Sequence, residues 1–196
     1  MRVYKATAPG MKARLGNGKD HPKMGLNITT EANCAQNGWH CAENPLDCLS
    51  YFSWDGKNEF YLCEAGGDIH ESANASVVSC TELTMVKRLH AVEFVAAAIR
   101  YIIIHPSRPL HHRINESVTV TEKEFFGIAC GRHPTASGEA GTVLGLVQKD
   151  EKGNITAIHI EKVGYKNVRP KTIYTIDEQG LFVKKRLQKA GKKNAT

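Results

Sequence analysis

The stretch of residues 38–51 constrains the fold most, because a strand, a helix cap and a helix start follow one another within it. Trp39 and Cys41 would share one face of a short strand, since strand side chains alternate between faces. Asn44 before Pro45 suits a cap followed by proline at the first helical position. The sequence therefore predicts a strand that runs directly into a helix.

Apolar patterning predicts the other elements of the first half. Short apolar runs predict strands over residues 2–7, 25–29, 59–65 and 76–85, and a glycine pair directly after the third run is expected to end it. Apolar residues at helical spacing predict a helix from about residue 89 to 104. That helix is not expected to span a membrane, which takes about 20 apolar residues.

The second half has a different pattern. Strands predicted over residues 142–148, 155–163, 172–176 and 181–185 are separated by turn-forming residues and favour a four-stranded antiparallel module. A segment rich in small residues precedes them and is expected to be a connector. The predicted fold class is α+β, a mixed amino-terminal domain followed by a small antiparallel β module. The predicted divisions are a mixed domain over 1–113, a connector over 114–141, the β module over 142–185 and a basic flexible tail over 186–196.

The excess positive charge lies at the carboxy-terminal end. The chain has 26 basic and 20 acidic residues, a formal net charge of +6, and no acidic residue follows Glu178. A basic end of this kind is either a solvated segment that aids solubility or a weak, salt-sensitive and non-specific contact for nucleic acid or another anionic partner. The basic residues after Glu178 are Lys184, Lys185, Arg186, Lys189, Lys192 and Lys193.

The six cysteines invite a disulfide or zinc framework, and the sequence favours neither. The amino terminus has no charged-then-apolar signal segment, and no Cys-x-x-Cys or His-x-x-x-His pair is present. We expect buried free thiols, a reducing cytoplasm and no metal site.

The segment Gly-Trp-His-Cys-Ala-Glu-Asn-Pro-Leu-Asp at residues 38–47 resembles the Gly-Phe-His-Ala-Cys-Glu-Asn-Pro-Leu-Asp hallmark of an uncharacterised family found in phages and prophage-like mobile elements of gut bacteria. Trp39 replaces the phenylalanine, and residues 41–42 invert the Ala-Cys order. The similarity extends over nearly the whole chain, from Val-Tyr-Lys-Ala at 3–6 to Arg-Pro-Lys-Thr-Ile-Tyr at 169–174. It implies a phage or mobile-element accessory protein and no defined chemistry.

A weaker similarity, in the order of the predicted elements, is to the first half of ADP-ribosyltransferase-like domains. These domains hold a nicotinamide dinucleotide, and their carboxylate stabilises an oxocarbenium-like ribose. The chain departs from the pattern, because the usual first-strand histidine or arginine is absent from the Tyr-Lys-Ala segment at residues 4–6, and Glu64 lies in a strand that sheet packing explains better. The similarity implies the catalytic residues Lys5, His40 and Glu64. For ligand binding we assign Tyr4, Trp39 and Tyr51; NAD is the cofactor only under this alternative.

Two basic groups are candidate macromolecule-binding sites. The first lies in the linker after the predicted helix. As a solvated linker it needs no function, which is the simpler interpretation; as a phosphate-binding patch, its guanidinium groups would bind phosphate in a bidentate way. Adjacent histidines diverge, which makes the linker a poor metal site. The second group is the start of the basic tail. The candidate residues are Arg108, His111, His112 and Arg113 in the linker and Lys184, Lys185 and Arg186 at the tail.

Three functional hypotheses follow. The first is an accessory protein in the bacterial host cytoplasm that binds a host protein or ribonucleoprotein, as an inhibitor of a defence system such as a CRISPR effector. It needs no cofactor and no enzyme activity. The second is an ADP-ribosyltransferase-like enzyme that modifies a host protein or nucleic acid. The third is a structural or virion-associated protein in which the β module serves assembly.

Overall fold

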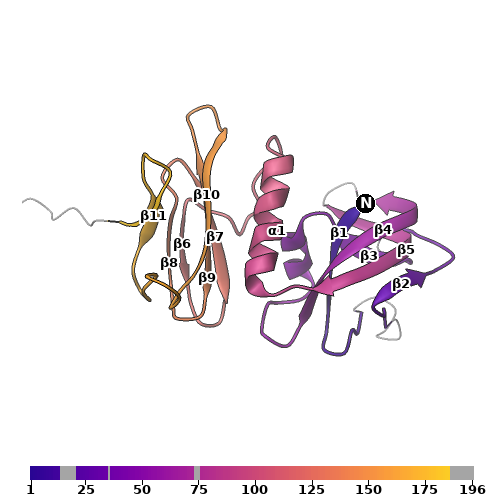
Figure 1. The fold of residues 1–196 in the computed structure, drawn as a ribbon. Coiled ribbons are helices and arrows are strands. Elements are labelled where there is room, and N and C mark those ends of the chain that lie inside the picture. The colour runs from indigo at the N-terminus through magenta and orange to yellow at the C-terminus, as the bar shows by residue number, and fades with distance from the viewer. Residues whose placement is uncertain (14–20, 35, 73–75, 186–196) are drawn as a thin grey trace, which may run out of the picture.

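The computed structural model describes residues 1–13, 21–34, 36–72 and 76–185. Three parts follow one another in space (Figure 1): a barrel built from the first five strands, a helical layer, and two sheets formed by the last seven strands. The helix α1 stands between the barrel and the sheets, and its side chains contribute to the packing of both.

The amino-terminal strands close into a small barrel. The sheet order is β2-β5-β3-β1-β4, and β4 pairs with β5 as well, which joins the two sides of the sheet. Both β4 and β5 are long, and β4 changes register against β5 between Gly66 and Ile69, where the strand bends. The strands are β1 (Arg2–Thr7), β2 (Gly25–Ile28), β3 (Trp39–Ala42), β4 (Glu59–Glu71) and β5 (Val77–Arg88).

The expected end of β4 at the glycine pair is wrong. Gly67 has a positive φ of 64°, a conformation that glycine adopts at little cost, so the strand bends there and continues to Glu71. A side chain at Gly67 would also overlap the hydroxyl of Thr81 on β5. The glycines therefore shape the barrel instead of ending the strand.

Successive side chains of β1 point alternately into the barrel interior and toward the helical layer. Val3 packs inside the barrel with residues of β3, β4 and β5, and Lys5 and Thr7 follow on the same face. Tyr4 and Ala6 face the other way and pack with the helical layer. Each face of β1 is thus buried, which leaves Arg2 as its only exposed residue.

The helical layer consists of the 3-10 helix η1 (Pro45–Ser50) and α1 (Ala91–Ile104). Glu93 supports the start of α1, where its carboxylate accepts a hydrogen bond from the His90 backbone N–H at 3.0 Å. The predicted helix is confirmed, with its first turn two residues later than expected. Its buried face comprises Phe94, Val95, Ala98, Ile99 and Ile102.

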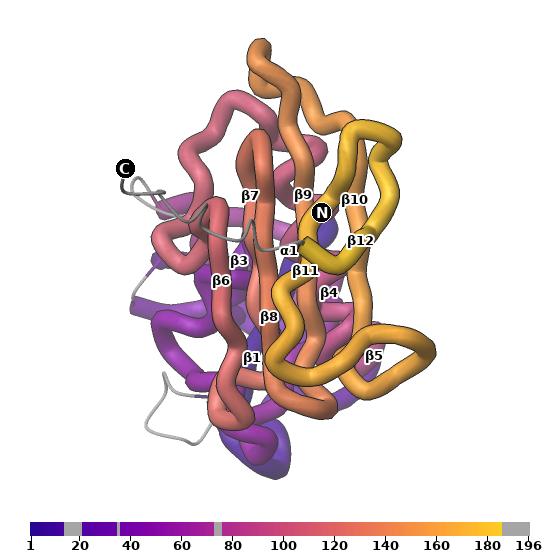
Figure 2. The backbone as a smooth tube through the Cα atoms, turned by 90° about the vertical axis from the view of Figure 1, so that its left-hand side faces the viewer, coloured from indigo at the N-terminus to yellow at the C-terminus, as the bar shows by residue number. Residues whose placement is uncertain are grey.

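The carboxy-terminal strands form two stacked sheets. The sheet next to α1 has the order β10-β9-β7, and the outer sheet has the order β12-β11-β8-β6 (Figure 2). On β9, Val143 and Val147 face α1, whereas Leu144 and Leu146 pack between the sheets. The strands are β6 (Ser117–Val120), β7 (Phe126–Gly131), β8 (Thr135–Gly138), β9 (Val143–Lys149), β10 (Ile155–Lys162), β11 (Tyr174–Ile176) and β12 (Phe182–Lys184).

The predicted α+β fold class is wrong, because the protein is mostly β. Strands make up 45% of the structure and helices 11%, and the first domain is a barrel instead of a mixed domain. The predicted four-stranded antiparallel module over residues 142–185 is also wrong. Its strands form two antiparallel pairs, β9 with β10 and β11 with β12, that belong to different sheets. Earlier strands complete these sheets through parallel pairs, β7 with β9 and β6 with β8. Three strands, β6, β7 and β8, lie largely within residues 114–141, the segment expected to be a connector.

Two properties of the described chain complete the fold. No helix in these ranges is both long and apolar enough to cross a membrane. All six cysteines are free thiols; Cys34 is half-buried and the other five are buried.

Candidate functional site

The start of η1 is built as its sequence indicates. Asn44 adopts an extended backbone at the cap, and its side-chain oxygen accepts a hydrogen bond from the Leu46 N–H at 3.1 Å. Pro45 occupies the first turn, where no backbone donor is needed. The Asn44 N–H donates to Ser76 Oγ at 2.9 Å, which ties the cap to the start of β5. The predicted strand-to-helix stretch is confirmed, although the helix is of the 3-10 type.

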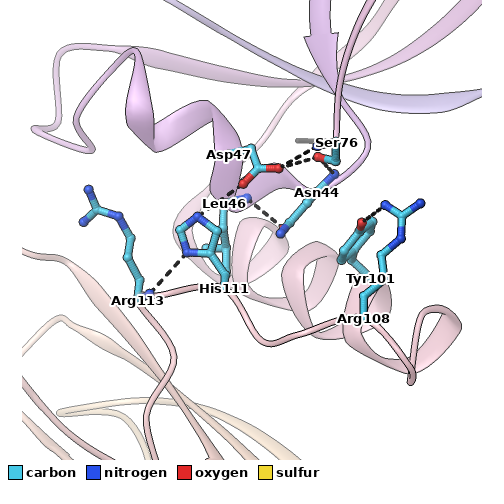
Figure 3. Close-up of polar contacts among 8 residues, drawn as sticks. All are labelled: Asn44, Leu46, Asp47, Ser76, Tyr101, Arg108, His111 and Arg113. Carbon is cyan, nitrogen blue, oxygen red and sulfur yellow. Dashed lines mark hydrogen bonds and ion pairs between the residues drawn. The ribbon is translucent and has the colours of Figure 1, made fainter. Parts of the chain in front are cut away.

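Asp47 joins this cap to the linker that follows α1 (Figure 3). Its carboxylate accepts a hydrogen bond from Ser76 Oγ at 2.5 Å and lies 3.3 Å from His111 Nε2. Burial by itself raises the pKa of Asp47, but the hydrogen bonds from His111 and Ser76 outweigh burial and lower that pKa. We call Asp47, Ser76 and His111 the linker clamp.

His111 is a structural part of the linker clamp. Its side chain is only 7% exposed, and its Nδ1 accepts a hydrogen bond from the Arg113 N–H at 3.3 Å. An imidazole that accepts at Nδ1 can donate from Nε2, which is the atom that faces Asp47. His111 thereby fastens the linker to η1.

The other three candidate residues of the linker, Arg108, His112 and Arg113, are exposed, and Arg108 also contacts α1. The Arg108 Nη1 donates to the Tyr101 hydroxyl at 2.6 Å, and its guanidinium lies 5.9 Å from the Tyr101 ring centre. Two of the four candidate residues in the linker, His111 and Arg108, therefore contact the body of the protein.

Lys5 lies inside the barrel. It is 6% exposed, and its Nζ donates to the backbone carbonyl of His40 at 2.7 Å and lies 6.0 Å from the Trp39 ring centre. Burial raises the pKa of the neighbouring Cys63 thiol to about 12, although the Lys5 charge opposes that shift. Its surroundings also include Cys41 and Cys80.

The candidate catalytic residues do not meet at one site. Lys5 contacts the backbone of His40, and it is paired in the sheet with Tyr61, whereas Glu64 is paired with Arg2. Glu64 is exposed and alternates with the inward-facing Cys63, so its carboxylate lies outside the barrel. The pKa of His40 is lowered by burial and, to a smaller extent, by Lys5.

The candidate ligand-binding residues lie in three different surroundings. Tyr4 packs against the helical layer, Trp39 packs in the barrel interior, and Tyr51 is exposed at the end of η1. Of the candidate residues at the tail, Lys184 ends β12 and Lys185 is exposed directly after it. Arg186 lies outside the described residues. Within those residues, no group of three or more His, Cys, Asp or Glu side chains could hold a metal ion.

A surface on β2 is a feature that the sequence reasoning missed. β2 is at the end of the sheet order and, among the described strands, pairs only with β5. Its apolar side chains at alternate positions face outward, away from the barrel interior. The sequence showed the alternation, but alternation does not tell which face is covered. This surface, which we call the β2 surface, comprises Met24, Leu26, Ile28 and Val86, with exposed fractions of 50%, 59%, 67% and 43%.

In comparison with known proteins, a family model matches the amino-terminal part of the chain. Residues 1–97 match a family described as a domain of unknown function, DUF7666. No curated protein and no solved structure matches significantly. The matched segment covers the whole barrel, η1 and the first half of α1.

Proposed function

We propose that this protein acts by binding a host protein or ribonucleoprotein, as a phage or mobile-element accessory protein in the bacterial cytoplasm. The specific form of the proposal is inhibition of a defence system such as a CRISPR effector. The observation that carries the binding function is the β2 surface, where apolar side chains are exposed on an edge strand. Exposed apolar groups of this kind mark protein contacts, because their burial releases about 1.5–3 kcal/mol for each large side chain.

The arrangement of β2 suits an extended segment of the partner. Leu26 pairs with Thr84 and Ile28 with Glu82, so the outer face of β2 continues the outer face of β5. A partner strand added beside β2 would hydrogen-bond to the backbone edge that no described strand pairs with. It would place its own apolar residues, at every second position, beside Leu26 and Ile28. Val86, on the same face of β5, extends the surface.

The polar candidate residues support binding over catalysis. Lys5 is bonded to a carbonyl inside the barrel and Glu64 lies outside it, so the described residues supply no assembled acid, base and ligand cradle. In the linker, Arg108 and His111 contact Tyr101 and Asp47. The other described candidate residues, His112, Arg113, Lys184 and Lys185, are exposed and could contact a charged partner. Salt would screen such contacts.

The test is affinity capture from a bacterial lysate with the full chain, with and without nuclease and at low and high salt. The test variant carries Leu26→Lys and Ile28→Lys together. Leu181→Lys is the matched control, because Leu181 is 57% exposed and lies in the turn before β12, away from β2. We expect a discrete protein to be captured at high salt by the wild type and the control, and to be lost with the double variant.

Three results would contradict the proposal. The first is capture that survives in the Leu26→Lys, Ile28→Lys variant while thermal unfolding shows a folded protein. The second is recovery of salt-labile nucleic acid alone. The third is self-association, measured by sedimentation, that disappears in the same variant; the β2 surface would then join two copies of this chain.

A further inference from the structure

A second surface feature is a groove between α1 and β1, on the side of the barrel that faces the helix. Its volume is about 240 Å³, which is below the roughly 300 Å³ at which sites for drug-sized ligands begin. A groove of this size fits a small ligand or one group of a larger one. Its polar lining consists of Arg2 and Tyr4 from β1, Glu43 before η1, and Arg100, Tyr101 and His105 from α1 and its end.

Arg2 and Arg100 are the basic groups of this groove. Both are exposed, they come from different elements, and neither forms an ion pair with a described residue. Both positive charges act on the Tyr4 side chain, where they oppose the rise in pKa that burial causes. Independently of these charges, Arg2, Arg100 and Tyr4 all line the same groove.

Tyr4 supplies a further hydrogen-bonding group. Its ring is 95% buried in the helical layer, whereas its hydroxyl has no hydrogen-bond partner among the described residues. A phenol hydroxyl beside two guanidinium groups is free to donate to an anion that these groups bind. By contrast, the Tyr101 hydroxyl already accepts a hydrogen bond from Arg108.

Two carboxylates lie near the arginines and set the charge balance. Glu43 lines the groove, and its Oε2 is 3.9 Å from His105 Nε2. Glu64 is opposite Arg2 in the β1–β4 pairing, but no ion pair joins them. Neither carboxylate forms an ion pair with Arg2 or Arg100 among the described residues, so both guanidinium groups keep their donors for a ligand.

We propose that this groove binds a phosphate monoester, with Arg2 and Arg100 on its oxygens and the Tyr4 hydroxyl as a third donor. A carboxylate has two oxygens and can be satisfied by one guanidinium, whereas a phosphate has three terminal oxygens that two guanidinium groups and a hydroxyl can share. Tyr101, Ala97 and Ile104 line the same groove and offer an apolar wall for the organic substituent. The site lies on α1 and is separate from the β2 surface.

The experiment is isothermal titration of the full chain with phenyl phosphate, inorganic phosphate and benzoate at low salt. The variants are Arg2→Ala, Arg100→Ala and Tyr4→Phe, which keeps the buried ring. Arg169→Ala is the matched control, because Arg169 is an exposed arginine in the loop before β11 without a described ion pair. Thermal unfolding of each variant verifies that the fold is intact.

We expect phenyl phosphate to bind more tightly than inorganic phosphate, because only phenyl phosphate contacts the apolar wall, and benzoate to bind weakest. Each arginine variant should weaken the binding of phenyl phosphate by roughly tenfold or more, and Tyr4→Phe should weaken it by a smaller factor. The control should bind as the wild type does. Failure of phenyl phosphate to bind at millimolar concentration, binding that the arginine variants leave unchanged, or tighter binding of benzoate would each overturn the proposal.

Discussion

Replacement of Asp47 by asparagine tests whether the linker clamp stabilises the junction between η1 and the chain that follows α1. The variant keeps the shape of the side chain but removes its charge. It therefore weakens the 2.5 Å hydrogen bond from Ser76 Oγ and the 3.3 Å contact with His111. We expect the free energy of unfolding to fall by about 2 kcal/mol, since a hydrogen bond to a charged group contributes about 1.5–3 kcal/mol and asparagine retains one acceptor.

This magnitude follows from the burial of the partners. The side chains of His111 and Asp47 are 7% and 20% exposed, so solvent screens their contact less than it screens a surface ion pair, which contributes about 0–1 kcal/mol. For a chain of this length, a loss of 1 kcal/mol lowers Tm by about 2–4 °C. The expected decrease for Asp47→Asn is therefore about 4–8 °C near neutral pH.

The direction of the pH dependence follows from the pKa of Asp47, which is lowered in the folded protein. A carboxyl group with a lowered folded pKa stabilises the protein above its unfolded pKa, about 3.9, and this contribution is lost as pH falls through the folded value. The difference in Tm between the wild type and Asp47→Asn should be complete at pH 6 and should shrink below about pH 4.

The assay is thermal unfolding followed by circular dichroism from pH 3 to pH 7. Asp68→Asn is the matched control, because the Asp68 side chain is exposed and has no hydrogen bond or ion pair among the described residues. A double-mutant cycle with His111→Asn should give a coupling energy of about 1 kcal/mol. Two results would refute the role of the clamp. The first is that the effects of Asp47→Asn and His111→Asn on the free energy of unfolding add within about 0.3 kcal/mol, and the second is an equal Tm shift for Asp47→Asn and Asp68→Asn.

Two further predictions concern the barrel. Gly38→Ala should lower the free energy of unfolding by about 2 kcal/mol more than Gly25→Ala does. Both glycines have a positive φ, so the backbone strain is similar. A β-carbon at Gly38 would overlap Ser79 Oγ and lie 2.9 Å from Ala32 Cα, whereas a β-carbon at Gly25 would meet nothing within 4 Å. Equal losses in chemical denaturation would contradict this. At pH 8 a thiol reagent should modify the half-buried Cys34 faster than the five buried cysteines, which react only as fast as the protein opens. Burial raises the pKa of the Cys34 thiol as well as those of Cys48 and Cys63, the latter two to about 12, so the expected difference comes from access to the reagent. Modification of a buried cysteine at the rate of Cys34 would be the contrary result.

Much of the local structure could be predicted because it depends on neighbouring residues. The cap at Asn44 and Pro45, the strand β1 and the helix α1 all follow from residues close in sequence, and the structure contains all three. The hairpin of β9 and β10 around Gly153 is also present, since its turn chemistry is local.

The predicted fold class is wrong because strand pairing depends on residues far apart in the sequence. Alternation predicts β4 and β5, but not that β4 continues past a glycine bend or that the two strands pair and close a barrel. The strand β7 is buried on both faces, between α1 and the outer sheet, so it shows no alternation and its small residues resemble a connector.

The surroundings of the candidate site residues could not be predicted for a related reason. Lys5 follows a buried tyrosine in β1, and nothing in its neighbours indicates that it points into a closed barrel, bonded to the His40 carbonyl. The contact of His111 with Asp47 joins residues 64 positions apart, so the linker sequence could not distinguish a clamp from a phosphate-binding patch.

Because α1 lies between the barrel and the sheets, the match to the family model ends inside a packed helix. The DUF7666 match ends at residue 97, yet Ala98, Ile99 and Ile102 on the next turns of the same helix are buried. Gly145 on β9 lets the helix approach the sheet, since a β-carbon there would lie 2.9 Å from Val95 Cγ1. Any protein that shares only the first 97 residues must therefore supply its own end to the helix and its own cover for it, and residue 97 is a poor place to divide this chain for expression.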